Sequence, residues 1–133
     1  MSIIAGYLLR ISNREWVAKV FDMAIYFTSL RRNWKAGRTI LFLHKTAAGD
    51  ALVGYGVIDK ACDVGDLSEE DRRECEKGQW RTALEFRYVR QFEKPLLVKT
   101  TFLRSSKLRG KYFHGLGLDK NQVEDLVAQG ESL

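Results

Sequence analysis

The chain has 133 residues, enough to bury roughly two thirds of the surface that its unfolded form exposes, so a single domain over residues 1–133 needs no metal or disulfide for stability. Hydrophobic residues make up 45% and charged residues 29%, and no apolar run approaches the ~20 residues of a membrane helix. We therefore expect no membrane-spanning segment. The 22 Lys and Arg residues outnumber the 17 Asp and Glu residues, which favours an anionic partner.

The start of the chain and the two cysteines argue against secreted and metal-binding classes of protein. The apolar run MSIIAGYLL lacks a basic leader and stops at Arg10 after the length of a strand, which does not fit a secretory signal. We expect a cytoplasmic protein. Cys62 and Cys75 have no CxxC spacing and no neighbouring His, so we expect two free thiols, no metal site and no cofactor.

The first third of the chain alternates strand and helix signals. Apolar residues predict a central strand over 3–11. Ser12 and Glu15 match the S-x-x-E capping box, which predicts a helix from Asn13 or Arg14 to about Met23. Residues 25–29 are typical of an aromatic loop or a short strand, and we expect a short helical turn over 30–34.

The rest of the chain is dominated by strand signals. Segments 39–45 and 51–60 flank the turn AAGD and predict a hairpin. Residues 63–78 lose the hydrophobic pattern, which predicts a solvated loop with a short helix after Ser68. A strand over 80–92, a turn at Lys94-Pro95, a short strand over 96–98 and a final helix capped by Asp119 with Gln122 follow. This order predicts an α+β fold with a mixed or antiparallel barrel that closes its edges.

Several segments in this order resemble the EVE domain of the PUA-like superfamily. They are ISNRE with Trp16, WKAGRTILFLHK followed by GDALVGYGVI, KPLLV, and FLRSSKLRGKYFHGLGLDKNQVEDL. The resemblance covers nearly the whole chain. It implies a PUA-like mixed β pseudo-barrel of about five to six strands flanked by short helices. It also implies a nucleic-acid-binding module whose cleft receives a base, since EVE and the related YTH modules are readers of modified bases in DNA or RNA.

Aromatic and polar residues near the strand ends are candidates for such a cleft, because stacked rings can hold a base. Trp80 and Phe113 belong to the same set of rings, although any ring can instead be part of the core. Ser12 can cap the helix or bind a ligand, and Asn13 can offer a donor and an acceptor to a base edge. The predicted base-binding cleft comprises Ser12, Asn13, Trp16, Tyr26, Phe27, Trp34, His44, Tyr112 and His114.

Basic residues gather in the stretches 31–38 and 104–111, and a fold that brings these together makes one basic face for a nucleic-acid backbone. The predicted phosphate-binding residues are Arg31, Arg32, Arg104, Lys107, Arg109 and Lys111. We expect the partner to be RNA or DNA that can carry a modified base.

We expect no catalytic residues, because neither His44 nor His114 has a Ser, Cys or Asp placed for a relay. Two alternatives remain open at this point. The same barrel can serve a small-molecule or nucleotide-binding protein or an enzyme, and the acidic segment 63–78 can serve a protein-interaction module.

Overall fold

The computed structural model describes residues 3–105 and 113–133, and over these ranges the backbone forms a mixed six-stranded sheet with three α-helices. The α+β class predicted from the sequence is therefore confirmed. The elements along the chain are β1 (Gly6–Arg10), α1 (Arg14–Met23), β2 (Ile25–Thr28), β3 (Thr39–Thr46), β4 (Gly49–Asp63), η1 (Val64–Asp66), α2 (Glu69–Gly78), β5 (Thr82–Leu97), η2 (Val98–Thr100), η3 (Phe102–Ser105), β6 (Gly117–Leu118) and α3 (Lys120–Glu131).

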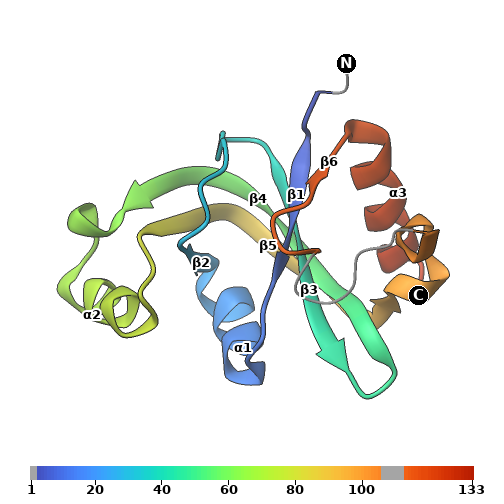
Figure 1. Cartoon of the computed structure of the whole chain (residues 1–133), viewed down its shortest axis with the longest axis horizontal. Coiled ribbons are helices and arrows are strands. Elements are labelled where there is room, and N and C mark those ends of the chain that lie inside the picture. The colour runs from blue at the N-terminus through green and yellow to red at the C-terminus, as the bar shows by residue number, and fades with distance from the viewer. Residues whose placement is uncertain (1–2, 106–112) are drawn as a thin grey trace.

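The strands lie in the order β2-β5-β4-β3-β1-β6. β1 and β3 run parallel, and the other neighbours run antiparallel. The long strands β4 and β5 carry α2 to one end of the molecule, while α3 lies at the other (Figure 1). In the described chain no pairing joins the outer strands β2 and β6, so the expectation of a barrel with closed edges is wrong. Register shifts along β4 mark bulges that bend the sheet without closing it.

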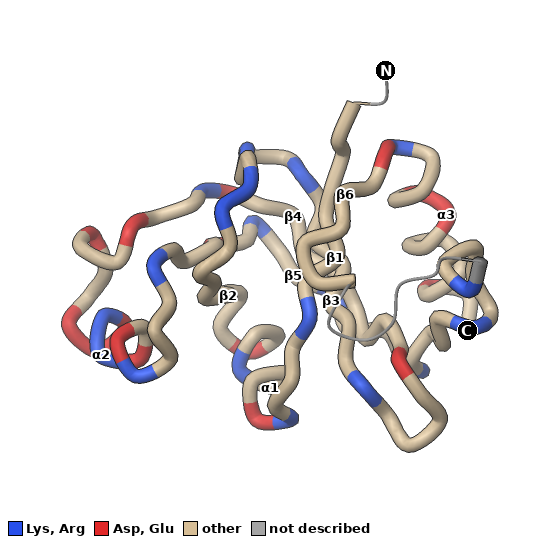
Figure 2. Tube along the Cα trace, viewed as in Figure 1, with Lys and Arg blue, Asp and Glu red and all other residues tan. Residues whose placement is uncertain are grey.

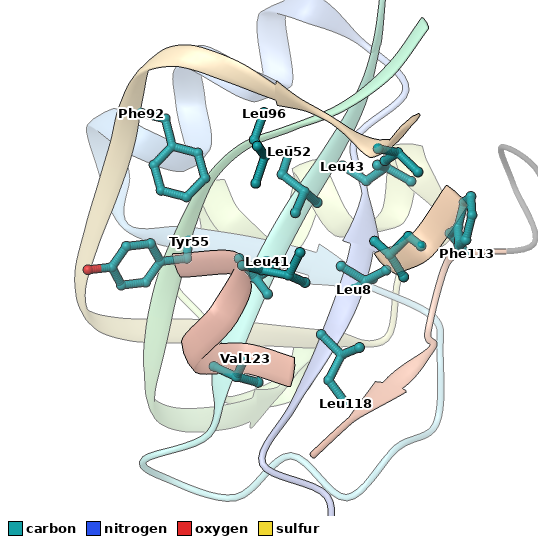
Figure 3. Close-up of a cluster of buried hydrophobic side chains, with 13 residues drawn as sticks. Leu8, Leu41, Leu43, Leu52, Tyr55, Phe92, Leu96, Phe113, Leu118 and Val123 are labelled. Atoms are coloured by element: carbon teal, nitrogen blue, oxygen red, sulfur yellow. The ribbon is translucent and has the colours of Figure 1, made fainter. Parts of the chain in front are cut away.

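Both faces of the sheet are buried, which explains the near-continuous apolar runs of β1 and β3. Because successive side chains of a strand point to opposite faces, Leu8 and Leu41 join the cluster that α3 covers (Figure 3), whereas Leu9 and Phe42 join the cluster that α1 covers. A third, small cluster lies near α2 and consists of Ile25, Phe27, Cys75 and Ala83, with Trp16, Val64, Leu67 and Trp80 packed against it.

Local signals placed two helices correctly. Ser68 caps α2 by accepting a hydrogen bond from the backbone N–H of Asp71 at 3.2 Å. Asp119 and Gln122 form the predicted capping box of α3, with bonds of 2.8 and 3.0 Å in the two directions. Cys62 and Cys75 are free thiols, as predicted.

Residues 25–28 form a strand, the second of the two alternatives predicted for that segment. Two local predictions differ from the structure. Residues 30–34 form no helical turn, and β5 runs through the predicted turn at Lys94-Pro95 to Leu97. Pro95 is tolerated because it lies between the pairs Gly54–Gln91 and Leu52–Leu96, where the register shifts and its missing N–H removes no ladder bond.

Gly54 of β4 allows α1 to pack closely on the sheet. A Cβ atom at this position would collide with the carbonyl oxygen of Arg90 and with the ring of Phe21 in α1. The backbone oxygen cannot move away without disturbing the β4–β5 ladder. A glycine is therefore required at the contact that fixes α1, and with it the chain between β1 and α1.

We predict that Gly54→Ala lowers the free energy of unfolding by about 1–3 kcal/mol, because overpacking forces the backbone or the Phe21 ring to shift. Urea denaturation followed by circular dichroism measures the change. Gly65→Ala is the matched control, since a Cβ there meets no atom within 4 Å, and it should change stability by no more than ~0.5 kcal/mol. Equal effects of the two substitutions would contradict the proposed role of Gly54.

Candidate functional site

A pocket of about 280 Å³ lies where the chain leaves β1 and enters α1. Its wall comes from five places in the chain: the end of β1, the start of α1, β2, the residue pair before β5, and the segment before β6. The lining residues are Arg10, Ile11, Ser12, Asn13, Trp16, Val20, Tyr26, Phe27, Trp80 and His114. Six of the nine residues predicted for a base-binding cleft are thus brought together at one hollow.

Three aromatic rings form one side of the pocket. Phe27 of β2 stacks on Trp80, with ring centroids 5.7 Å apart and an interplanar angle of 19°. Trp16 of α1 stands edge-on to both rings, at 5.7 Å from Phe27 and 5.0 Å from Trp80. Phe27 is buried, whereas the two tryptophans are partly exposed. The indoles therefore offer ring surface to a ligand without having to leave the core.

The polar rim at the start of α1 differs from the predicted capping box. Asn13 is the N-cap of α1, and its Oδ1 accepts a hydrogen bond of 2.7 Å from the backbone N–H of Glu15. Ser12 is not the cap, because the chain reaches helical geometry one residue later than that motif requires. Its exposed hydroxyl has no role in capping. The Asn13 side chain keeps its NH₂ donors and the second lone pair of Oδ1, so the expectation that Asn13 presents a donor and an acceptor together stays a prediction.

The floor of the pocket is held by hydrogen bonds to the backbone of Arg10. The Arg10 N–H donates to Nδ1 of His114 at 2.8 Å, and the Arg10 carbonyl accepts from the hydroxyl of Tyr26 at 2.8 Å. These bonds join β1 to β2 and to the segment before β6. The side-chain Nε of Arg10 is buried and has no hydrogen-bond partner in the described chain.

Burial and charge set the protonation of these groups. Burial raises the pKa of Tyr26 far above its usual value, so its hydroxyl keeps the proton that it donates. Burial, and then the charges of Arg32 and Arg10, lower the pKa of His114. Arg32 is fixed beside this histidine because its Nε donates to the carbonyl of Gly115 at 3.1 Å. His114 is therefore neutral near pH 7, with Nδ1 as an acceptor.

The remaining predicted cleft residues lie elsewhere. Trp34 is not a pocket residue, because its ring packs edge-on against Tyr7 at 5.2 Å in the cluster under α1. His44 does not line the pocket either, because it turns back to the β1 end and its Nδ1 lies 2.7 Å from the carbonyl of Ile11. Tyr112 lies outside the described residues.

The predicted basic face is only partly within the described chain. Arg31 and Arg32 are exposed in the loop between β2 and β3, where Figure 2 shows several basic residues in succession. Arg104 is exposed and lines a second hollow of about 250 Å³ with Lys99 and Phe113. Lys107, Arg109 and Lys111 lie outside the described residues, so the convergence of the two basic stretches stays a prediction.

Two pocket residues were not predicted as site residues. Trp80 belonged to the wider set of candidate rings, but nothing local separated it from a core tryptophan. Arg10 was treated only as the end of an apolar run. A sequence signal for Arg10 does exist: it is a single charged residue between Leu9 and Ile11, both of which are buried. A charged residue in such a position needs a partner or a function.

Four cations lie next to lining residues, in sequence or in space, and form what we call the basic rim: Arg14, Lys19, Arg32 and Arg81. Arg14 and Arg81 each follow a lining residue in sequence, and the Lys19 Nζ lies 4.7 Å from the ring centroid of Trp16. None of the four forms an ion pair with a carboxylate of the described chain. They are thus available to an anionic partner.

Other kinds of site find no support in the parts of the chain that the structure describes. Over residues 3–105 and 113–133, no three His, Cys, Asp or Glu side chains are grouped so as to hold a metal ion. Over the same ranges, none of the helices has the length and apolar character that crossing a bilayer requires.

Comparisons with known proteins show the fold. The sequence matches no protein-family model and no curated protein. Among solved structures it is similar to ASCH from Zymomonas mobilis, at 18% identity over 91% of this chain and 94% of that chain, with a TM-score of 0.61. A serine-to-alanine mutant of that protein aligns over 96% and 99% of the two chains at 18% identity and a TM-score of 0.61. A tyrosine-to-phenylalanine mutant aligns over 91% and 96% at 17% identity and a TM-score of 0.62.

These ASCH neighbours have a PUA-like pseudo-barrel fold, so the predicted PUA-like fold is confirmed. At 17–18% identity the likeness concerns the backbone alone. It does not single out the EVE type.

We predict that His114 makes the protein less stable below about pH 6.5, the usual pKa of an unfolded histidine. The folded state lowers the pKa of His114, so below that pH the unfolded chain binds a proton that the folded chain resists, and stability falls as the pH falls. Thermal melts at pH 7.5 and 5.0 measure this.

The His114→Gln variant should lose less stability between these two pH values than the wild type, because its amide does not titrate. The matched control is His44→Gln, which removes a histidine whose Nδ1 faces a carbonyl and should keep the His114 effect. An identical pH dependence in wild type and His114→Gln would show that the His114 environment does not favour the neutral ring.

Proposed function

We propose that this protein is a nucleic-acid-binding module in which the pocket receives one base and the basic rim holds the adjoining phosphates. The PUA-like fold supports this proposal, as does the position of the rim next to the residues that line the pocket. Phosphate contacts by Arg and Lys give affinity without sequence preference, whereas a base in a pocket gives selectivity. The proposal therefore assigns affinity to the basic rim and selectivity to the pocket residues, and the two sets can be mutated separately.

The single observation that carries the proposal is the ring wall of Trp16, Phe27 and Trp80 beside free polar groups. A volume of about 280 Å³ lies near the lower end of the range of roughly 300–1,000 Å³ for small-molecule pockets. That size suits one flat heterocycle rather than a larger ligand. Stacking on an aromatic side chain contributes roughly 1–3 kcal/mol per base, so the wall supplies the main attraction.

We further propose that the base is a modified one. The resemblance of ISNRE and WKAGRTILFLHK to EVE-domain segments supports this, because EVE domains read modified bases. A substituent such as a methyl group would lie against the indoles and gain from desolvation. Whether the backbone is RNA or DNA is left to the binding experiment below.

Binding is the preferred role over catalysis. His114 is the one histidine among the described residues that line the pocket, and its Nδ1 already accepts the Arg10 N–H. No Asp or Glu belongs to the described lining, so His114 has no carboxylate partner to orient it as a base. An enzyme or a binder of free nucleotides on the same fold is the alternative that the experiment must separate.

We predict that single-stranded RNA or DNA binds with an affinity that falls as salt rises, because phosphate binding releases counterions. Fluorescence anisotropy with oligonucleotides over a range of salt concentrations measures this. Arg14→Gln should weaken all sequences alike and reduce the slope of log Kd against log salt by ~0.7, the value for one phosphate contact on a single strand. Trp16→Ala should weaken binding by ~1–3 kcal/mol and leave the slope unchanged.

The matched control is Arg73→Gln. Arg73 is an exposed arginine on α2 that pairs with Glu69 at 2.7 Å and does not line the pocket, so its loss should change neither affinity nor slope by much. Affinity that ignores salt, or that responds to Arg73→Gln as strongly as to Arg14→Gln, would count against the proposal. Binding of free nucleotides alone would favour the alternative.

A further inference from the structure

The hydrogen-bonding groups that the pocket leaves unused are mostly donors. We propose that the pocket selects a base whose edge carries a ring carbonyl oxygen, as in hypoxanthine or uracil, over the base in which an amino group replaces that oxygen, as in adenine or cytosine. This inference rests on the proposed function, since it concerns the same pocket. It follows from counting which polar atoms of the lining are already occupied within the protein.

Arg10 supplies the first free donor. A guanidinium group has five N–H donors, no acceptor, and does not lose its proton in proteins. The Nε of Arg10 is buried without a partner in the described chain, and a buried donor without an acceptor is unfavourable. Arg10 lines the pocket, so the other N–H groups of its guanidinium are candidates to meet a ligand oxygen. Bidentate contact of Arg with the O6 and N7 acceptors of guanine is a common form of base recognition.

His114 and Asn13 supply further donors. Because Nδ1 of His114 accepts the Arg10 N–H at 2.8 Å, the proton of the neutral ring resides on Nε2, which can only donate. Oδ1 of Asn13 already accepts the Glu15 N–H at 2.7 Å, which leaves its side chain with the two N–H donors of the NH₂ group and one oxygen lone pair. Three side chains from different parts of the chain therefore present N–H groups.

The acceptors of the same region are largely occupied. The carbonyl of Arg10 accepts from the Tyr26 hydroxyl, and that of Ile11 faces Nδ1 of His44 at 2.7 Å. The carbonyl of Asn13 accepts from the first turn of α1. No carboxylate belongs to the described lining, so the hydroxyl of Ser12 and the second lone pair of Asn13 Oδ1 are the side-chain acceptors left. An amino group on the base would thus lose its hydrogen bonds with water and find few replacements.

The test compares bases that differ by one exchange of an amino group for an oxygen. Single-stranded oligonucleotides with one base in a run of abasic positions carry hypoxanthine or adenine in one pair, and uracil or cytosine in the other. Titration calorimetry with the full chain at pH 7 gives the four affinities. We expect the oxygen-bearing member of each pair to bind about tenfold or more tightly, the size typical of a paired base-edge contact.

Two variants probe the donors. Asn13→Asp keeps an oxygen for the helix cap, since Asp caps as well as Asn, but replaces the NH₂ donor by an acceptor, so the preference should shrink or reverse. Arg10→Met keeps an apolar stem and removes the guanidinium, and should shrink it as well. Thermal melts check that the Arg10→Met variant folds. If it does not fold, the Asn13→Asp variant alone tests whether the donors cause the preference. Arg73→Gln is the control and should leave the preference unchanged.

Equal affinity for both members of a pair, or a preference for the amino member, would overturn the inference and leave the proposed function standing. A preference that survives both Asn13→Asp and Arg10→Met would also overturn it, because these donors would then not be its cause. Absence of binding for all four oligonucleotides would instead overturn the proposed function itself.

Discussion

The end of β1 is the point on which both the fold and the pocket depend. Pairing of β1 with β6 ends at Tyr7, whereas its pairing with β3 continues to Arg10. The N–H and carbonyl of Arg10 and the carbonyl of Ile11 would then be left without strand partners. Side chains take over from the missing strand: His114 accepts from the Arg10 N–H, Tyr26 donates to the Arg10 carbonyl, and His44 lies within hydrogen-bonding distance of the Ile11 carbonyl. These three residues come from the segment before β6, from β2 and from β3. The bonds that terminate the strand are thus the same bonds that shape the hollow beside it.

Because the same hydrogen bonds end the strand and shape the pocket, the polar side of the pocket is held in place before a ligand binds. The orientation of His114 is fixed by a backbone N–H, and the Asn13 side chain is fixed by the helix that it caps. Groups held in this way lose little conformational freedom on binding, which favours affinity and selectivity. The same arrangement limits which substitutions are informative, since removing Tyr26 or His114 also breaks a backbone contact of β1. Partly exposed side chains such as Trp16 and Asn13 are better probes because the core depends on them less.

Sequence patterns predicted those features that depend on neighbouring residues. The caps of α2 and α3 were found from Ser68 and from Asp119 with Gln122, because each motif closes within one helical turn. The pocket site of Trp16 followed from its place at a strand-to-helix corner. Features set by distant contacts were missed. Nothing near Trp34 indicates that Tyr7 packs against it, and nothing near Arg10 indicates that its Nε stays unpartnered. The local pattern left residues 25–28 open between a loop and a short strand, and pairing with the distant strand β5 decides for the strand.

The pocket wall is shared between two hydrophobic clusters. Phe27 and Trp80 belong to the small cluster near α2, whereas Tyr26 and Val20 of the same pocket belong to the larger cluster beneath α1. The hollow therefore lies between two clusters of unequal size that Trp16 connects, and the smaller one lies near the end of the long strands β4 and β5 (Figure 1). Small regions with few buried contacts open locally at lower free energy than the whole domain. Local opening of the smaller cluster would widen the hollow on its aromatic side while leaving the polar side in place, so entry and release of a ring need not disturb the main core.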